Sequence, residues 1–384
     1  MSNIFIDFTY FAFDTPFLNN AIYGKIRISK LRLNCLAYTK RRLNVMESKL
    51  VVGVIGLVMG KTHLEGVLAY GAEVGAICDV NEELLNSVGD ELNIPKERRT
   101  TNYLDIVNNK EINTVLIVTP DQTHKQMVEE CISAGKHIMC EKPLALTRED
   151  LGAIVDATKK SDRKFMVGQI CRFTPAFVKA KEIIDSGKIG EVYYVESEYA
   201  HDYVYILGDP ENWRADPMRH GVVGGGCHAV DLLRWYAGDP EEVCAYGVHK
   251  NLMHLAYDDT TISILKFPNG VIGKVFVSIG CKRDYTMRTL IYGTKGTIIC
   301  DNTSPTMQVF STDDIGRMAE TPEIIEIEVN NHNAKYEFAV FADSVINNKP
   351  MEMGAEEGAK TVATCLAIVE SSKTGTPIKP DYKF

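Results

Sequence analysis

The chain has 384 residues, of which 45% are hydrophobic and 24% are charged, a composition typical of a globular protein and a length that favours two domains. A net charge of −9 argues against nucleic acid or an anionic membrane as the main partner. No apolar run is long enough to cross a bilayer. The ten cysteines form no Cys-x-x-Cys pair and several lie in apolar runs, which favours a reducing, cytoplasmic compartment.

Residues 1–45 differ from the rest of the chain. They hold seven basic residues against two acidic ones, a net charge of +5. Aromatic residues precede the basic cluster, which is the reverse of a secretory signal, and no small-residue cleavage site follows. We expect an upstream extension outside both domains, with the functional start at Met46. A targeting presequence is the alternative.

The segment 46–168 alternates between strand and helix patterns. Short apolar runs, of the kind buried in a parallel sheet, are separated by helical patterns, with Asn81 and Thr147 at helix N-cap positions. Right-handed crossovers make this a doubly wound parallel sheet, the first domain of an α/β fold. The predicted strands are 51–55, 73–78, 114–118, 136–140 and 164–167, and the predicted helices are 62–70, 82–92, 103–108, 122–134 and 148–160.

The segment 169–384 changes to long runs of alternating residues. Turn sequences such as Pro268-Asn269-Gly270 separate these runs, which predicts a large, mostly antiparallel open sheet. The pattern indicates a second α/β domain. Its predicted strands are 191–201, 242–250, 260–267, 271–279, 286–292, 296–300 and 324–329, and its predicted helices are 176–186, 335–347 and 356–374.

A glycine-containing loop joins the first predicted strand to the first helix. Such a loop lets backbone N–H groups approach a pyrophosphate at the helix N-terminus. Asp79, at the end of the second strand, is placed to accept hydrogen bonds from an adenosine ribose and to repel a 2′-phosphate, which favours NAD over NADP. The glycine spacing is irregular, and a helix-capping role for Asp79 is the alternative. The predicted cofactor loop comprises Gly56, Leu57, Val58, Met59 and Gly60.

Glu141-Lys142-Pro143 stands at the end of another predicted strand. In open α/β sheets, ligands bind at the carboxyl ends of the strands. A lysine held there between a carboxylate and a φ-restricting proline is placed to act on a ligand, whereas a charged triplet alone is usually solvated surface. The apolar run 115–118 leads to Thr119-Pro120 and then His124 at the same edge of the sheet.

A second dense motif is the run 224–228, Gly-Gly-Gly-Cys-His, with Asp231 one helical turn after His228. A histidine presented by a glycine loop is a candidate for proton transfer, since its ordinary pKa is near neutrality; a buried structural histidine is the alternative. An aromatic and polar stripe precedes it, suited to a sugar ring or equally to core or interface packing. We predict no metal, because no ligands have a recurring spacing. The stripe comprises Tyr199, His201, Tyr203, Tyr205, Trp213, Arg214 and His220.

Taken in order, these motifs resemble the Gfo/Idh/MocA oxidoreductases over roughly residues 49–379. The resemblance implies a Rossmann domain over 46–168, a substrate-binding and oligomerisation domain over 169–384, and homodimers or homotetramers built on the open sheet. It also implies oxidation of a hydroxyl of a sugar, inositol or related polyol with NAD(P). The motifs that carry it are Gly56–Gly60, Asp79, Thr119-Pro120 with His124, Glu141-Lys142-Pro143, Gly168-Gln169 with Arg172-Phe173, and Gly226-Cys227-His228 with Asp231.

By that similarity, Lys142 contacts the nicotinamide ribose and the reacting hydroxyl, and His228 is the acid/base. Pro120 and His124 line the nicotinamide pocket. The implied cofactor contacts also include Thr119, Glu141 and Gln169, and the implied substrate contacts are Lys142, Arg172, Tyr203, Trp213, Arg214, His228 and Asp231.

The chain departs from the family pattern at two positions. Val58 replaces a loop glycine, and Gly224 stands where many members carry an aspartate four residues before the histidine. Either the lysine and histidine suffice, or a carboxylate such as Asp202 or Asp216 fills the role.

We therefore expect an NAD-dependent dehydrogenase that acts on a secondary hydroxyl of a carbohydrate or polyol. One alternative is an enzyme that uses tightly bound NAD transiently, for elimination or glycoside cleavage. Another is a non-catalytic NAD(P)-binding regulator.

Overall fold

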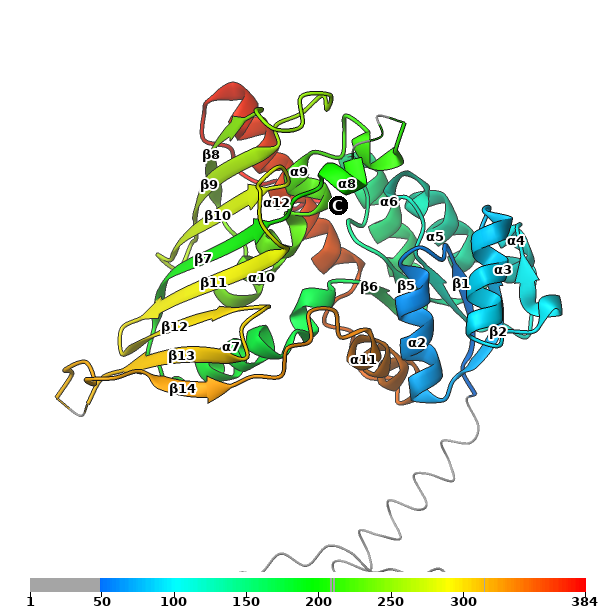
Figure 1. Ribbon diagram of the computed structural model, residues 1–384, viewed down its shortest axis with the longest axis horizontal. Helices are drawn as coiled ribbons and strands as arrows, with labels where there is room; N and C mark the ends of the chain where they lie inside the picture. The colour runs from blue at the N-terminus through cyan, green and yellow to red at the C-terminus, as the bar shows by residue number, and fades with distance from the viewer. Residues whose placement is uncertain (1–48, 208, 210, 314) are drawn as a thin grey trace, which may run out of the picture. The chain divides into compact units, whose positions relative to one another are not determined.

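Two sheets organise the residues that the structure describes, which are 49–384 without 208, 210 and 314 (Figure 1). The structure is a computed structural model, and Leu50–Phe384 form one compact unit. The expectations for residues 1–45 and for a start at Met46 lie outside the described residues. None of the described helices is both long and apolar enough to span a membrane.

The first sheet has six parallel strands in the order β3-β2-β1-β4-β5-β6. The chain order reverses between β1 and β4, so the carboxyl ends of these two strands flank the crevice where such sheets bind ligands. The predicted doubly wound sheet is thus confirmed. Its strands are β1 (Val51–Ile55), β2 (Glu73–Cys78), β3 (Arg99–Thr100), β4 (Thr114–Ile117), β5 (His137–Cys140) and β6 (Phe165–Val167).

Helices connect these strands, and two of them begin at the predicted caps. The side chain of Asn81 accepts a hydrogen bond from Leu84 N–H at 3.0 Å, and that of Thr147 accepts one from Asp150 N–H at 3.1 Å. The helix predicted over 122–134 begins later, because a single 3₁₀ turn precedes it. The helices are α2 (Gly60–Tyr70), α3 (Glu82–Glu91), α4 (Tyr103–Asn108), α5 (His124–Ser133) and α6 (Arg148–Lys159).

The second sheet has eight strands in the order β14-β13-β12-β11-β7-β10-β9-β8. Every pair is antiparallel except β7 with β10, which confirms a mostly antiparallel sheet. Strand β13 was not predicted, although its sequence alternates. The strands are β7 (Val192–Ala200), β8 (Glu242–Val248), β9 (Thr260–Lys266), β10 (Ile272–Ser278), β11 (Thr286–Gly293), β12 (Gly296–Asp301), β13 (Thr306–Ser311) and β14 (Glu323–Glu326).

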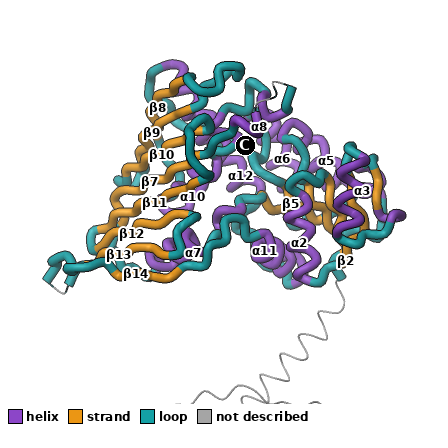
Figure 2. The backbone as a smooth tube through the Cα atoms, viewed as in Figure 1, coloured by secondary structure: helices purple, strands orange, loops and turns teal. Residues whose placement is uncertain are grey.

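Helices α7, α10 and α12 lie beside this sheet, as Figure 2 shows. Side chains on its strands alternate between buried and exposed, so one face packs on these helices and the other is open. Two short helices precede α10 and were not predicted. The remaining helices are α7 (Pro175–Asp185), α8 (Val204–Leu207), α9 (Gly221–Gly224), α10 (Cys227–Ala237), α11 (Ala334–Ile346) and α12 (Ala355–Thr374).

Helix α11 returns to the first sheet. Phe338 and Phe341 share a buried cluster with Leu64 and Val67 of α2. Gly66 of α2 permits this packing, because a Cβ there would lie 2.7 Å from the carbonyl oxygen of Ala334. The late segment of the chain therefore helps to build the layer that carries the cofactor loop.

Candidate functional site

The loop between β1 and α2 forms one wall of a cavity of about 360 Å³. Gly56 has a φ of +87°, and a Cβ there would meet the carbonyl oxygen of Val118 at 2.3 Å, so only glycine fits. No side chain caps α2 at Met59, although the N–H groups of Lys61 and Thr62 already donate to the carbonyl oxygens of Leu57 and Met59 at 3.1 and 3.0 Å. Val58 is 70% exposed and lines the cavity. These features fit a pyrophosphate despite the missing glycine.

Asp79 lies beside this loop at the end of β2. Its two carboxylate oxygens accept hydrogen bonds from Leu57 N–H at 2.8 Å and from Asn81 N–H at 2.9 Å. Asp79 also lines the cavity, and each oxygen can accept a further hydrogen bond. Since the Asn81 side chain caps α3, the capping alternative for Asp79 is unnecessary. Its position fits a ribose diol.

Strand β4 leads to Thr119 and Pro120, which line the cavity. His124 lies behind them, fully buried and outside the lining. Its Nδ1 is 3.0 Å from the carbonyl oxygen of Pro143, and its Nε2 is 3.1 Å from that of Thr119. His124 therefore ties the loops after β4 and β5 together, and supports the pocket that it was expected to line.

Strand β5 delivers Glu141 and Lys142 to the cavity. Glu141 Oε2 accepts a hydrogen bond from Lys142 N–H at 2.9 Å, and its Oε1 lies 2.8 Å from Nε2 of His63. Burial acts to lower the pKa of Lys142, while nearby Cys227 and Glu141 act to raise it, and the net pKa is above its ordinary value. Lys142 is a cation at neutral pH, so it can stabilise negative charge but cannot act as a base.

His228 begins another wall at the start of α10. It is 3% exposed, and its Nδ1 has no hydrogen-bond partner among the described residues. The ring stacks on Tyr199 with centroids 6.3 Å apart. Burial and the charge of Lys142 hold the pKa of His228 well below its ordinary value. The imidazole is therefore neutral at neutral pH and able to accept a proton.

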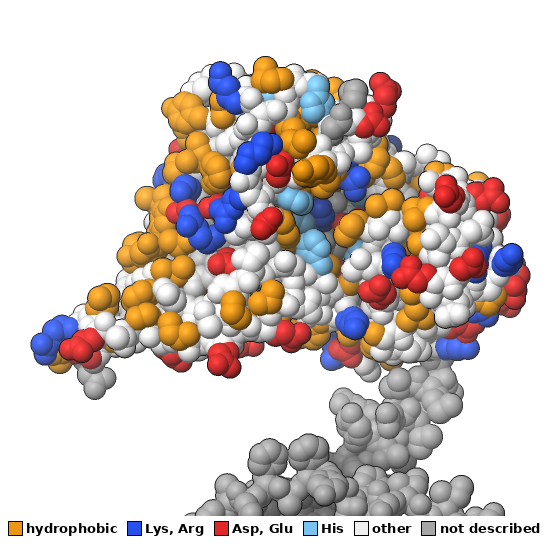
Figure 3. Space-filling view, in the orientation of Figure 1, with side chains coloured by type: hydrophobic (Ala, Val, Ile, Leu, Met, Phe, Trp, Pro, Cys, Tyr) orange, Lys and Arg blue, Asp and Glu red, His pale blue; other side chains and the backbone are white. Residues whose placement is uncertain are grey.

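The cavity gathers most of the predicted site residues, and histidine side chains show in the hollowed part of the face in Figure 3. Gln169 lies outside the lining, although its buried amide has no partner among the described residues and would suit a polar ligand group. Gly60, His124, Arg172 and Asp231 also lie outside. The predicted residues in the lining are Gly56, Leu57, Val58, Met59, Asp79, Thr119, Pro120, Glu141, Lys142, Tyr203, Trp213, Arg214 and His228.

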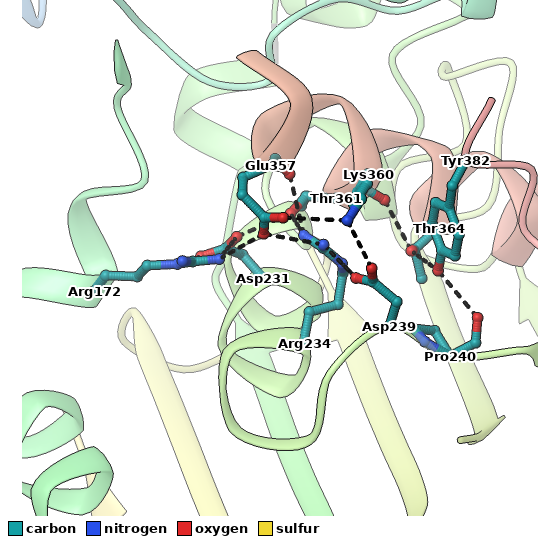
Figure 4. A network of polar contacts seen from close by, with 10 residues as sticks. All are labelled: Arg172, Asp231, Arg234, Asp239, Pro240, Glu357, Lys360, Thr361, Thr364 and Tyr382. Carbon is teal, nitrogen blue, oxygen red and sulfur yellow. Dashed lines mark hydrogen bonds and ion pairs between the residues drawn. The ribbon is translucent and has the colours of Figure 1, made fainter. Parts of the chain in front are cut away.

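Arg172 and Asp231 pair with each other. Nε and Nη2 of Arg172 donate to the two carboxylate oxygens of Asp231 at 2.7 and 2.8 Å, and Thr361 donates to the same carboxylate at 2.9 Å. Figure 4 shows the pair continuing into a network with Arg234 and Glu357, between α10 and α12. In place of the implied substrate contacts, both residues support the helix that carries His228.

Arg219 fills the space beside Gly224. A Cβ at residue 224 would lie 2.3 Å from Nη1 of Arg219. Arg219 is buried, lines the cavity, and donates through Nε to Asp121 at 2.7 Å. Gly224, one of the two departures from the family pattern, therefore leaves room for a guanidinium that is already paired with Asp121.

Neither aspartate suggested as a substitute lines the cavity. Asp202 lies 3.3 Å from the Lys282 ammonium, and Asp216 accepts a hydrogen bond from the Gln122 amide at 2.8 Å. The expectation that one of them fills the role is not supported by this geometry.

The structure adds lining residues that sequence reasoning did not assign. His63 stands three residues after the glycine loop, and Asp121 follows Thr119-Pro120, so attention to the neighbours of each motif would have found both. Tyr285 and His332 come from distant segments without a local signal. The full set is Thr62, His63, Val80, Val118, Asp121, Ile170, Ile206, Arg219, Tyr285 and His332, and Tyr199 and His201 of the predicted aromatic and polar stripe also line the cavity. Within residues 49–384 as described, no group of three or more potential ligands could hold a metal ion.

Two family models match the chain. One, described as an oxidoreductase family with an NAD-binding Rossmann fold, matches residues 50–169, and the GFO/IDH/MocA C-terminal domain matches residues 177–299. Myo-inositol 2-dehydrogenase of Thermotoga maritima is 28% identical over 340 residues, which are 85% of this chain and 98% of the relative. Levoglucosan dehydrogenase of Pseudarthrobacter phenanthrenivorans is 28% identical over 290 residues, 65% of this chain and 72% of the relative.

A solved structure has the same fold. A levoglucosan dehydrogenase in complex with NADH and levoglucosan matches with a TM-score of 0.80 at 24% identity, over 87% of this chain and 100% of that chain. The first family model spans all six strands of the first sheet, and the second spans β7 to β11 and most of β12. The chain belongs to the Gfo/Idh/MocA family of NAD-binding oxidoreductases.

Proposed function

We propose that this protein oxidises a secondary hydroxyl of a sugar, inositol or related polyol with NAD. The observation that carries the proposal is one cavity that joins cationic Lys142 and neutral His228 to Asp79 and the glycine loop before α2. Relatives named for myo-inositol and levoglucosan, both polyhydroxylated rings, support the substrate class.

Each lining residue then has a distinct role. The glycine loop and Asp79 bind the dinucleotide, and NAD, when bound, accepts the hydride that leaves the carbinol carbon. Lys142 stabilises the negative charge that develops on the substrate oxygen. His228 takes the hydroxyl proton as a general base.

The substrate end of the cavity is aromatic and basic. The guanidinium of Arg214 lies over the Trp213 ring at 4.3 Å, and the Tyr203 hydroxyl is 2.6 Å from that of Tyr199. Aromatic faces beside hydrogen-bonding groups suit the C–H face and hydroxyl rim of a sugar ring.

The test is a panel of inositols, hexoses and anhydrosugars incubated with the full chain and NAD, with NADH formation as the readout. We expect NADH with at least one polyhydroxylated ring, and Lys142→Ala should lower kcat by about a thousandfold or more. Lys110→Ala, an exposed lysine after α4, is the matched control. Full activity of Lys142→Ala would contradict the proposal.

A second candidate function is suggested by two further histidines in the cavity. His201 and His332 line it, each has a ring nitrogen without a partner among the described residues, and burial lowers both pKa values. Simple dehydrogenation needs one proton acceptor, whereas elimination or glycoside cleavage after transient oxidation needs more. Cofactor that copurifies and is not consumed during turnover would favour this candidate.

We also propose a cytoplasmic location and a homo-oligomer. All the described cysteines are free, which suits a reducing compartment. The open face of the second sheet exposes Tyr246, Ile262, Ile264 and Ile272, which suits burial against another copy of the chain.

A further inference from the structure

Three buried side chains connect α11 to the cavity. Glu337 of α11 places a carboxylate oxygen 3.7 Å from Nδ1 of His63, and Nε2 of His63 lies 2.8 Å from Oε1 of Glu141. The other oxygen of Glu141 accepts the backbone N–H of Lys142. The series therefore runs from a helix in the last part of the chain to the residue that faces the substrate.

The cluster holds two carboxylates and one imidazole; Glu337 and His63 have almost no access to water, whereas the Glu141 side chain is 13% exposed and lines the cavity. Glu337 is fully buried, His63 is 1% exposed, and both Glu337 oxygens lack a hydrogen-bond partner among the described residues. Burying two carboxylate charges with a neutral imidazole would carry a large desolvation cost. A proton bound to the cluster removes most of this cost.

The pKa shifts of the three side chains also indicate that the cluster binds a proton. Burial raises the pKa of Glu337 to about 8. Burial acts to lower the pKa of His63, but the hydrogen bond and charge of Glu141 and the charge of Glu337 outweigh it, so that pKa is raised. Burial acts to raise the pKa of Glu141, but its hydrogen bond with His63 and the charges of His63 and Lys142 hold it at about 2. Other charged or titratable groups that interact with Glu141 are Lys142, Arg214, Cys140 and His332.

The positive charge of Lys142 can interact either with the Glu141 carboxylate or with the substrate oxygen. If His63 were neutral, the Glu141 carboxylate would attract the Lys142 ammonium, the next positive group along the chain. If a proton stays on the His63–Glu337 pair, Glu141 is neutralised from the side opposite the substrate.

We propose that Glu337 is a positioning residue that keeps a proton on the His63–Glu337 pair, so that His63 neutralises Glu141 and the Lys142 ammonium stays free for the substrate oxygen. This inference rests on the function proposed above for Lys142. It assigns a role at the cofactor end of the site to a helix that lies outside the matched Rossmann segment.

The first test needs no substrate. ¹⁵N NMR of the histidine side chains, with His63→Gln used to assign the signal, reports how many protons the His63 ring carries. We expect a ring protonated at both nitrogens near neutral pH in the native protein, and loss of that proton at lower pH in Glu337→Gln, by about one pH unit or more. A His63 ring that is neutral throughout in the native protein, or unchanged in Glu337→Gln, overturns the proposal.

The second test uses the pH dependence of turnover. Glu337→Gln keeps the shape of the side chain, so we expect kcat within about twofold of native near pH 6 and about tenfold lower near pH 8, with NAD affinity kept. Phe341→Leu, which disturbs the packing of the same helix, should lower the melting temperature without changing how kcat falls at alkaline pH. An equal loss at all pH values in Glu337→Gln would mean that Glu337 is only structural.

The two tests separate the two proposals. If NMR shows a His63 ring whose second proton depends on Glu337 but no substrate of the panel is oxidised, the proton on the His63–Glu337 pair is confirmed and the proposed function fails. If oxidation occurs but the alkaline limb of Glu337→Gln matches the native one, the function stands and the role of Glu337 falls.

Discussion

His228 shows how its surroundings change the chemistry of a residue. The sequence predicts a histidine with an ordinary pKa, and hence loss of activity close to neutral pH. Burial and the Lys142 charge place the pKa of His228 well below that value. In the proposed function the neutral ring is the base, so activity should be lost only as the pH falls through this lowered pKa.

We therefore expect the acid limb of kcat/KM to lie well below the ordinary pKa of histidine and to disappear in His228→Ala, with kcat about a hundredfold lower. Lys142→Ala should cost more, because it removes the charge that stabilises the developing alkoxide. Initial rates across the pH range measure both effects. An intact limb in His228→Ala would show that the base lies elsewhere, with His201 and His332 as the next candidates.

Asp79 gives the second prediction at the scale of single residues. Its carboxylate lines the cavity beside the glycine loop, so a 2′-phosphate would face a negative charge. NAD should bind about tenfold or more tightly than NADP, and Asp79→Asn should narrow that difference mainly by improving NADP binding. Fluorescence titration of both cofactors tests it, and equal affinities for the native protein would place Asp79 away from the ribose.

Some residue assignments could not come from sequence. Lys142 and Asp79 could be placed at the cavity from the sequence, because each follows a strand whose carboxyl end lies at the ligand-binding edge of a doubly wound sheet. His228 was expected there from its glycine motif and the family resemblance. Arg172 and Asp231 occur in the same motifs, yet they bind each other. Which way a side chain points from its helix depends on tertiary partners such as Thr361, more than a hundred residues away.

At the scale of elements, local signals placed most boundaries. Caps at Asn81 and Thr147 fixed two helix starts, since they satisfy backbone N–H groups within a few residues. Strand β13 was missed because its signal is a short alternation without a strong turn. The parallel pairing of β7 with β10 joins segments that are far apart in the chain, and no local pattern encodes it.

The contact between α2 and α11 gives a prediction with an internal control. Gly66→Ala gains helix propensity but must displace the Ala334 backbone, so it should lower the free energy of unfolding by about 1–3 kcal/mol. Gly152→Ala in α6 meets nothing within 4 Å and should be neutral or stabilising by up to about 1 kcal/mol. Urea denaturation compares the two. Equal effects would mean that α11 does not pack closely on α2.

At the scale of the whole molecule, the open face of the second sheet is the feature that a monomer leaves unexplained. Hydrophobic side chains gather over its strands in Figure 3. Tyr246 and Ile262 are exposed neighbours on adjacent strands. We expect native protein to sediment as a dimer or tetramer, and the double variant Tyr246→Lys with Ile262→Lys to sediment as a smaller species. Leu104→Lys, on α4, is the control, and a native monomer would contradict the prediction.

The pairing of Arg219 with Asp121 beside Gly224 restricts which substitutions could introduce a carboxylate at residue 224. An aspartate introduced at 224 alone would collide with a held guanidinium before it could serve as a base. Removing Arg219 first would strand the buried carboxylate of Asp121. The three positions are therefore coupled, and the effects of substitutions at Asp121, Arg219 and Gly224 should not add up.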